Sequence, residues 1–148
     1  MKLTQRTLHN RARLVEFQYP ETNYQQAKNM LTFMREQGGI GLAATQIGLR
    51  NRMFVMEINE KQWQCFNPEI EKLGDDFVEF DEGCLSFPGK SCKIQRPNTV
   101  DIRYQDANGK WHWETLTDLA SRCFQHELDH LDGITMWDRQ EEQNAKQS

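Results

Sequence analysis

Two histidines four residues apart, in the segment His126-Glu127-Leu128-Asp129-His130, are the strongest chemical signal in the sequence. On a helix such residues lie one above the other, about 6 Å apart along the axis, so both imidazoles can reach one divalent cation. Glu127 is rotated by about 100° from His126, so it is not expected to join them as a ligand but can reach a water on such an ion. The pattern therefore predicts a metal site with a carboxylate that acts as general base.

A catalytic metal site needs a third protein ligand, and the residues that follow the histidines supply none that fits. The thermolysin-type template requires a downstream glutamate on another helix, whereas only Glu141 and Glu142 follow, in a polar tail. The metzincin template requires a third histidine, and that position holds Met136. A metallopeptidase with this helix therefore remains an alternative that lacks its third ligand.

A thiolate is the next candidate, because cysteine binds zinc and ferrous iron well. Spacing alone does not choose among the four cysteines, which are Cys65, Cys84, Cys92 and Cys123. Cys84 stands beside a glycine, whose missing side chain permits close approach of another group. If a second thiol joined Cys84 and both histidines, the site would be a closed structural zinc module, although no Cys-x-x-Cys pair supports this alternative.

Three segments taken together resemble the peptide deformylase family. Gly39–Gln46 (GIGLAATQ) is similar to the family's first motif, Glu82–Ser86 (EGCLS) to its second and His126–His130 to its third, in the same order and at similar spacing. The resemblance extends from the first predicted helix to Gly133. It implies a metal-dependent hydrolase that removes the N-formyl group from the formyl-methionine of nascent polypeptides.

The resemblance also implies a ligand set and catalytic roles. The cofactor would be ferrous iron, with zinc possible, and its ligands would be Cys84, His126 and His130. Glu127 would handle the proton, while the Gln46 side chain and the Leu85 backbone N–H would hold the oxygen of the formyl group. Such preorganised donors are each worth about 10²–10³-fold in rate.

Further residues would bind the peptide substrate if the resemblance holds. The peptide channel and its methionine pocket would be formed by Gly39, Ile40, Gly41, Gly83, Leu119 and Cys123. A formyl carbon carries only hydrogen, so a tight site around Gly83 and Gln46 could exclude acetylated peptides by steric clash. This exclusion is a hypothesis, and similar kcat/KM values for acetyl and formyl peptides would contradict it.

The chain departs from the family pattern at two places. Bacterial members usually continue with a long C-terminal helix that helps them dock near the ribosomal exit tunnel, whereas the residues after Gly133 allow about four turns at most. The translating ribosome remains a candidate partner, but docking by that route is not expected, and the short form resembles members carried by phages. Arg122 stands where the family tends to be apolar, facing either solvent or the pocket rim.

Helices are predicted near both ends of the chain, because apolar residues recur there at helical spacing. Glu21–Gln37 forms one amphipathic helix, ended by Gly38-Gly39, and Asp118–Leu131 forms the helix that carries the histidines. The polar tail Arg139–Ser148 is expected to be frayed.

Strands are predicted in the middle of the chain, with a turn at Asp106–Gly109 that joins the last two into a hairpin. They are Arg52–Ile58, Trp63–Ile70, Phe77–Phe80, Thr99–Tyr104 and Trp111–Thr115. Together the elements predict an α+β fold, with small mixed or antiparallel sheets packed around the metal-binding helix, in a single catalytic domain over residues 1–148.

Composition narrows the class of protein further. The 148 residues are 37% apolar and 27% charged, enough for a single core, and a net charge of −4 argues against a nucleic-acid binder. No run of about 18–20 apolar residues is present, so no membrane span is expected. Because no export signal begins the sequence, the expected location is a bacterial cytoplasm, or that of an infected host, with reduced thiols.

Overall fold

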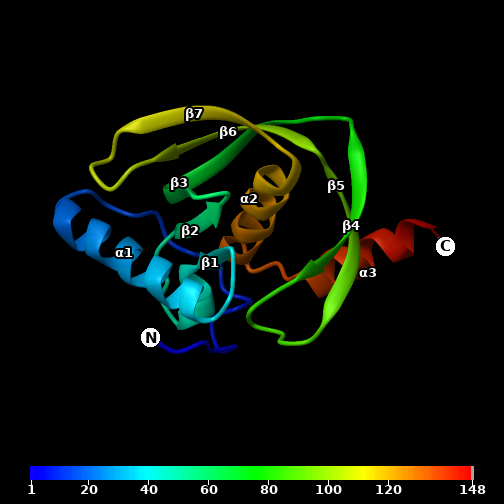
Figure 1. Ribbon diagram of the computed structural model, residues 1–148, viewed down its shortest axis with the longest axis horizontal. Coiled ribbons are helices and arrows are strands. Elements are labelled where there is room, and N and C mark those ends of the chain that lie inside the picture. The colour runs from blue at the N-terminus through cyan, green and yellow to red at the C-terminus, as the bar shows by residue number, and fades with distance from the viewer. Residues whose placement is uncertain (148) are drawn as a thin grey trace.

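A helix at the centre of the molecule lies between two antiparallel sheets, as Figure 1 shows for the computed structural model, which describes residues 1–147. This helix is α2 (Asp118–Leu131), the helix of the two histidines. The larger sheet has the strand order β1 (Gly41–Ala43), β2 (Met53–Ile58), β3 (Lys61–Leu73), β6 (Thr99–Gln105), β7 (Trp111–Thr117). The smaller sheet pairs β4 (Phe77–Gly83) with β5 (Ser91–Pro97). The predicted α+β fold is confirmed.

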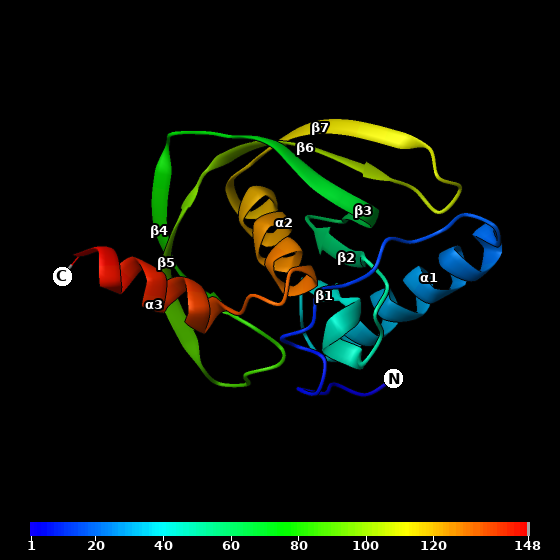
Figure 2. The same ribbon diagram turned by 180° about the vertical axis from the view of Figure 1, so that it is seen from behind.

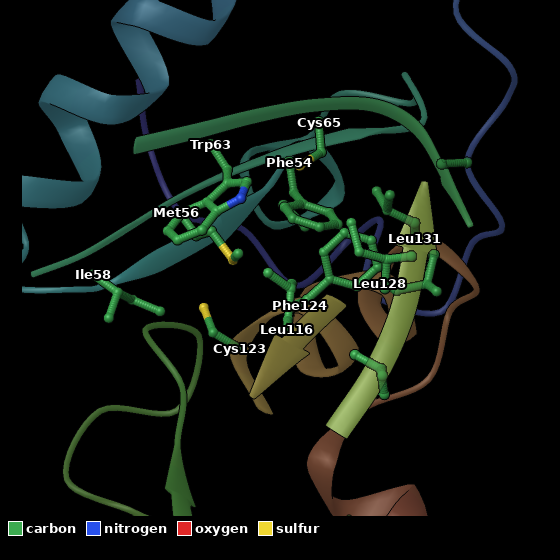
Figure 3. Packing of buried hydrophobic residues seen from close by; sticks show 14 residues of the cluster. Phe54, Met56, Ile58, Trp63, Cys65, Leu116, Cys123, Phe124, Leu128 and Leu131 are labelled. Carbon is green, nitrogen blue, oxygen red and sulfur yellow. The ribbon is translucent and has the colours of Figure 1, made fainter. Parts of the chain in front are cut away.

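Strand β2 has a hydrophobic core on each of its faces. Successive side chains of a strand point to opposite sides, so Phe54 and Met56 pack toward α2, whereas Met53 and Val55 pack toward α1 (Pro20–Glu36). Figure 3 shows the first of these cores, which includes Phe54 and Phe124. Their rings pack edge to face, with the ring centroids 5.1 Å apart. The sheet is therefore the middle layer between α1 and α2.

Helix α2 is buried on every side from Ser121 to Leu131, although seven of these eleven residues are polar or charged. Its apolar stripe, which includes Phe124, Leu128 and Leu131, faces the larger sheet. The polar stripe faces the smaller sheet. Burying charged groups is costly unless they are paired, so the residues opposite this stripe must supply partners.

The C-terminal tail is helical, which corrects the prediction of a frayed end. Helix α3 (Met136–Gln147) packs on β5, as Figure 2 shows from behind. The Gln143 side chain accepts a hydrogen bond from the Gln95 backbone N–H and donates one to the Gln95 carbonyl, both at 2.9 Å. The polar composition of the tail did not reveal this, because the partners of its side chains come from a distant strand.

The two predicted helices, the five predicted strands and the hairpin turn are confirmed to within a few residues. Strands β1 and β5 were missed. For β5 the reason is visible in its burial, since Cys92, Ile94 and Arg96 all face inward. An arginine at a core-facing position hides the alternation of apolar and polar residues. Among residues 1–147, no helix is both long and apolar enough to cross a membrane.

Candidate metal centre

The imidazoles of His126 and His130 meet on the polar stripe of α2, with their Nε2 atoms 3.2 Å apart. Cys84 follows β4, and its Sγ lies 3.3 Å from Nε2 of His130. One potential ligand atom from each of these three residues lies within 4.8 Å of the others. Residues 46 positions apart in the chain therefore converge on one point.

The spacing of these atoms fits a metal ion. Ligand atoms about 2.0–2.3 Å from a tetrahedral ion lie roughly 3.3–3.6 Å from each other, close to the two distances above. Burial, together with the neighbouring His126, holds the pKa of His130 well below its usual value, which favours the neutral imidazole that binds metals. The residues present therefore fit a divalent cation with sulfur and nitrogen ligands.

The other three cysteines lie outside this cluster. All four thiols are free of disulfides, and within residues 1–147 only Cys84 joins the two histidines. Burial raises the pKa of Cys65 and of Cys123 well above the usual value for a thiol, so these two stay protonated. Among the residues that the structure describes, no fourth His, Cys, Asp or Glu joins the cluster, as a closed structural zinc module would require.

Glu82 orients the first histidine. Its Oε1 accepts a hydrogen bond from Nδ1 of His126 at 2.9 Å, so the ring points Nε2 toward the cluster. Burial by itself would raise the pKa of Glu82, but the hydrogen bonds from His126 and Arg96 lower it to about 2. The carboxylate therefore stays charged, as a fixed counter-ion beneath the site.

Three arginines, two of them buried, form a charge network with the carboxylates of Glu82 and Asp129 on one side of α2. Arg96 donates to Glu82 at 2.5 Å and to Asp129 at 2.9 Å, and Arg139 of α3 donates to Asp129 at 2.8 Å. Arg122 also donates to Glu82, at 2.6 Å. Because each charge has an opposite charge beside it, none is buried unpaired. The ion pairs also connect α2, β4, β5 and α3.

The carboxylate of Glu127 is buried beside the cluster. Its Oε1 is buried without a hydrogen-bond partner among the described residues. Burial raises the pKa of Glu127 to about 7, although the neighbouring His126 opposes this shift. A buried carboxylate with a free oxygen can exchange a proton near neutral pH.

Gln46 reaches the cluster from the short helix η1 (Ala44–Ile47), which follows β1. Its Oε1 accepts a hydrogen bond from the Ala43 backbone N–H at 2.9 Å, and its Nε2 donates to Ser86 Oγ at 3.0 Å. The same nitrogen lies 3.4 Å from Cys84 Sγ. The amide N–H groups therefore point toward the cluster and not toward bulk solvent.

A cavity of about 580 Å³ opens onto the cluster. Its walls include Gly39, Ile40, Gly41, Gln46, Gly83, Cys84, Leu85, His126 and Glu127. A second cavity of about 90 Å³ adjoins it and is lined by Leu119 and Cys123 together with Ile40, Gly83, His126 and Glu127. The residues singled out from the sequence thus line these two adjoining cavities. The exception is His130, which lines neither cavity but lies beside Cys84 and His126.

Comparison with known proteins identifies the family. The sequence profile for polypeptide deformylase matches residues 1–146. The chain belongs to the peptide deformylase family. Family members remove the formyl group from the N-terminus of nascent peptides in a metal-dependent hydrolysis, so the chain is a hydrolase of this kind.

Individual deformylases agree in both sequence and structure. Peptide deformylase from Picosynechococcus sp. is 40% identical over 127 residues, which cover 82% of this chain and 68% of that protein. The crystal structure of peptide deformylase from Thermotoga maritima superposes with a TM-score of 0.87 at 36% identity and covers 91% of both chains. The deformylase of the Vibrio parahaemolyticus bacteriophage VP16T, solved with actinonin, has a TM-score of 0.85 at 32% identity and covers 92% of this chain and 100% of that one.

The deformylase motifs did not reveal every residue that supports the site. Sequence reasoning missed the carboxylate of Glu82 as a partner of His126 and the arginines that neutralise it. It also left open whether Arg122 faces solvent or a pocket rim, whereas its side chain is buried and lines the smaller cavity. The sequence did contain a signal, because Glu82 lies only two residues before Cys84. A carboxylate so close to a metal ligand needs a cationic or hydrogen-bonding partner when it is buried.

Proposed function

We propose that Cys84, His126 and His130 hold a ferrous ion, with zinc as a second possibility, and that the chain uses it to deformylate peptides that begin with formyl-methionine. The convergence of one thiol and two imidazole nitrogens within 4.8 Å is the observation that carries this proposal. A divalent ion would supply Lewis acidity toward the formyl carbonyl and toward water. One sulfur and two nitrogen ligands suit both iron and zinc, and the deformylase relationship favours iron.

Glu127 is the residue that moves the proton. It accepts a proton from the attacking water and delivers it to the peptide nitrogen as the carbon–nitrogen bond breaks, so the products are formate and a free amino terminus. Its free Oε1 and its pKa of about 7 suit both directions of transfer near neutral pH.

The Gln46 side chain and the Leu85 backbone N–H hold the formyl oxygen. As the carbonyl carbon becomes tetrahedral, negative charge grows on this oxygen, and donors already in place stabilise it without reorganisation. The hydrogen bonds from Gln46 to Ser86 and from Ala43 to Gln46 fix the carboxamide before substrate arrives.

The peptide occupies the larger cavity, and the methionine side chain enters the smaller one. Gly39, Ile40 and Gly41 border one side of the backbone and Gly83 the other, while Leu119 and Cys123 contact the methionine. Exclusion of acetylated peptides around Gly83 and Gln46 stays a prediction. We also propose that residues 1–148 act as one catalytic domain in the cytoplasm, where formylated chains are made.

The test is release of formate from formyl-Met-Ala by protein loaded anaerobically with ferrous iron, alongside the zinc form. We expect rapid formate release from wild type and loss of both metal and activity in Cys84→Ser. Cys92→Ala is the matched control, because that thiol lies outside the cluster. Full activity of Cys84→Ser, or internal cleavage of an unformylated peptide, would contradict the proposal.

A further inference from the structure

The smaller cavity is bounded by apolar side chains that are unusually exposed. Ile40, Phe80 and Leu119 keep 43%, 51% and 42% of their surface accessible. Covering a concave apolar surface with an apolar group lowers the free energy. We propose that Arg122 and Phe80 form a clamped wall that decides which first side chain of the substrate this cavity accepts. This inference rests on the proposed function and names a specificity-determining pair within it.

Arg122 ties the histidine helix to both strands of the smaller sheet. Its Nη1 donates to Glu82 Oε2 at 2.6 Å and to the Ile94 carbonyl at 3.0 Å, and its Nη2 donates to the Val78 carbonyl at 2.5 Å. The arginine belongs to α2, whereas Val78 and Glu82 belong to β4 and Ile94 to β5. The distance between α2 and β4, which are opposite walls of the cavity, is therefore held by Arg122 together with the hydrogen bond between His126 and Glu82.

The same guanidinium supports the ring of Phe80. Its Cζ lies 5.3 Å from the ring centroid, within the range of a cation–π contact. Phe80 lies between Val78 and Glu82 on β4, so the strand is bound to Arg122 on both sides of the ring. Although it is half exposed, the ring therefore has a fixed position against the cavity.

The clamped wall keeps the cavity small. Its volume of about 90 Å³ is less than a sixth of the volume of about 580 Å³ of the larger cavity. A slender, flexible, unbranched chain such as that of methionine suits this space, whereas an aromatic ring does not. We expect release of either member of the pair to widen the cavity and to relax this selection.

The contact between Arg122 and Glu82 separates specificity from general activity. Glu82 keeps Arg96 when Arg122 is lost, so its bond to His126 is weakened without being removed. A weaker bond lowers activity on every substrate by a similar factor. The ratio of activities on two side chains cancels that factor and reports on the cavity wall alone.

The experiment compares kcat/KM for formyl-Met-Ala and formyl-Phe-Ala in wild type, Arg122→Met and Phe80→Leu. We expect the phenylalanine-to-methionine ratio to rise at least about tenfold in both variants. Phe80→Leu removes the cation–π contact but leaves every hydrogen bond of Arg122 in place, so it decides the question of the wall if Arg122→Met does not fold. The affinities of the products Met-Ala and Phe-Ala, measured by NMR titration, should change in the same direction.

Arg103→Met is the matched control, because Arg103 also pairs with a carboxylate, Glu69, and covers an aromatic ring, that of Trp111, on the larger sheet. Its ratio should equal that of wild type. A phenylalanine-to-methionine ratio within twofold of wild type in both test variants would overturn the inference. A rise in Phe80→Leu alone would show that Arg122 does not determine specificity. If wild type releases no formate from any formyl peptide, the proposed function fails, and the product-binding ratio decides the role of the pair.

Discussion

Glu127 occupies the space that a side chain on residue 41 would need. A Cβ built on Gly41 would lie 2.5 Å from Oε2 of Glu127 and 2.8 Å from Sγ of Cys123. Atoms at such distances overlap, so the carboxylate can lie beside the cluster only because β1 begins with a glycine. The glycine-rich motif is thus fitted closely to α2, where Sγ of Cys123 also lies 3.9 Å from the carbonyl oxygen of Ile40, a residue 83 positions away in the chain.

Gly41→Ala should therefore displace Glu127 and lower kcat by about 10²-fold, since a misplaced general base loses most of its effect. Gly83→Ala is the informative partner, because its Cβ would meet only the Lys90 carbonyl at 3.9 Å. That variant should keep its metal and its stability, and it should change KM more than kcat. Steady-state kinetics on both variants, with metal content measured, checks this; equal losses in kcat would contradict it.

Glu127→Gln should bind metal normally but lose about 10²–10⁴-fold in kcat, because the amide keeps the shape of the side chain and cannot accept the proton. Metal content by atomic spectroscopy and formate release measure the two effects separately. Glu141→Gln, at an exposed position of α3, is the control. Turnover close to that of wild type in Glu127→Gln would remove the proton role from this residue.

Glu82→Gln should weaken both the fold and the metal site. Two buried arginines would lose their counter-ion, at a cost of about 3–5 kcal/mol in the free energy of unfolding. His126 would lose a charged partner, which typically lowers metal affinity about 10–100-fold. Urea unfolding and chelator competition measure these changes. Glu69→Gln breaks an exposed pair and should cost at most about 1 kcal/mol, so similar losses in the two variants would contradict the assignment.

Gln46→Leu should lower kcat about 10²–10³-fold with a stable fold and bound metal, because it removes a donor for the formyl oxygen. Ser86→Ala should have a smaller effect in the same direction, about tenfold, since it only frees the Gln46 carboxamide to rotate. Circular dichroism and metal analysis show whether the fold and the ion persist. An unchanged kcat in Gln46→Leu would show that Gln46 does not stabilise the formyl oxygen.

Removing the metal with a chelator should lower the melting temperature. An ion present at about 100 times its dissociation constant adds about 2.7 kcal/mol to the free energy of unfolding. Cys84→Ser should melt at one temperature with or without chelator, whereas Cys92→Ala should show the same difference as wild type. Scanning calorimetry measures this, and a chelator effect that persists in Cys84→Ser would point to an ion bound elsewhere.

Local patterns in the sequence were sufficient to locate the principal elements and the chemistry of α2. Helical spacing and strand alternation depend on neighbours in the chain, so α1, α2 and the hairpin between β6 and β7 could be predicted. The two histidines and Glu127 share one short segment, and their relation follows from helix geometry alone. Resemblance to deformylases then selected Cys84 among four cysteines, which spacing could not do.

Only the tertiary structure decided which distant groups meet. The pairing of Glu82 with His126, the burial of Arg122 and the packing of α3 on β5 join residues far apart in sequence. Arg96 at an inward position of β5 looks like a solvent-facing residue until Glu82 and Asp129 are placed beside it. A charged side chain can be buried wherever the fold brings an opposite charge to it, and that meeting depends on chain topology, which local periodicity does not encode.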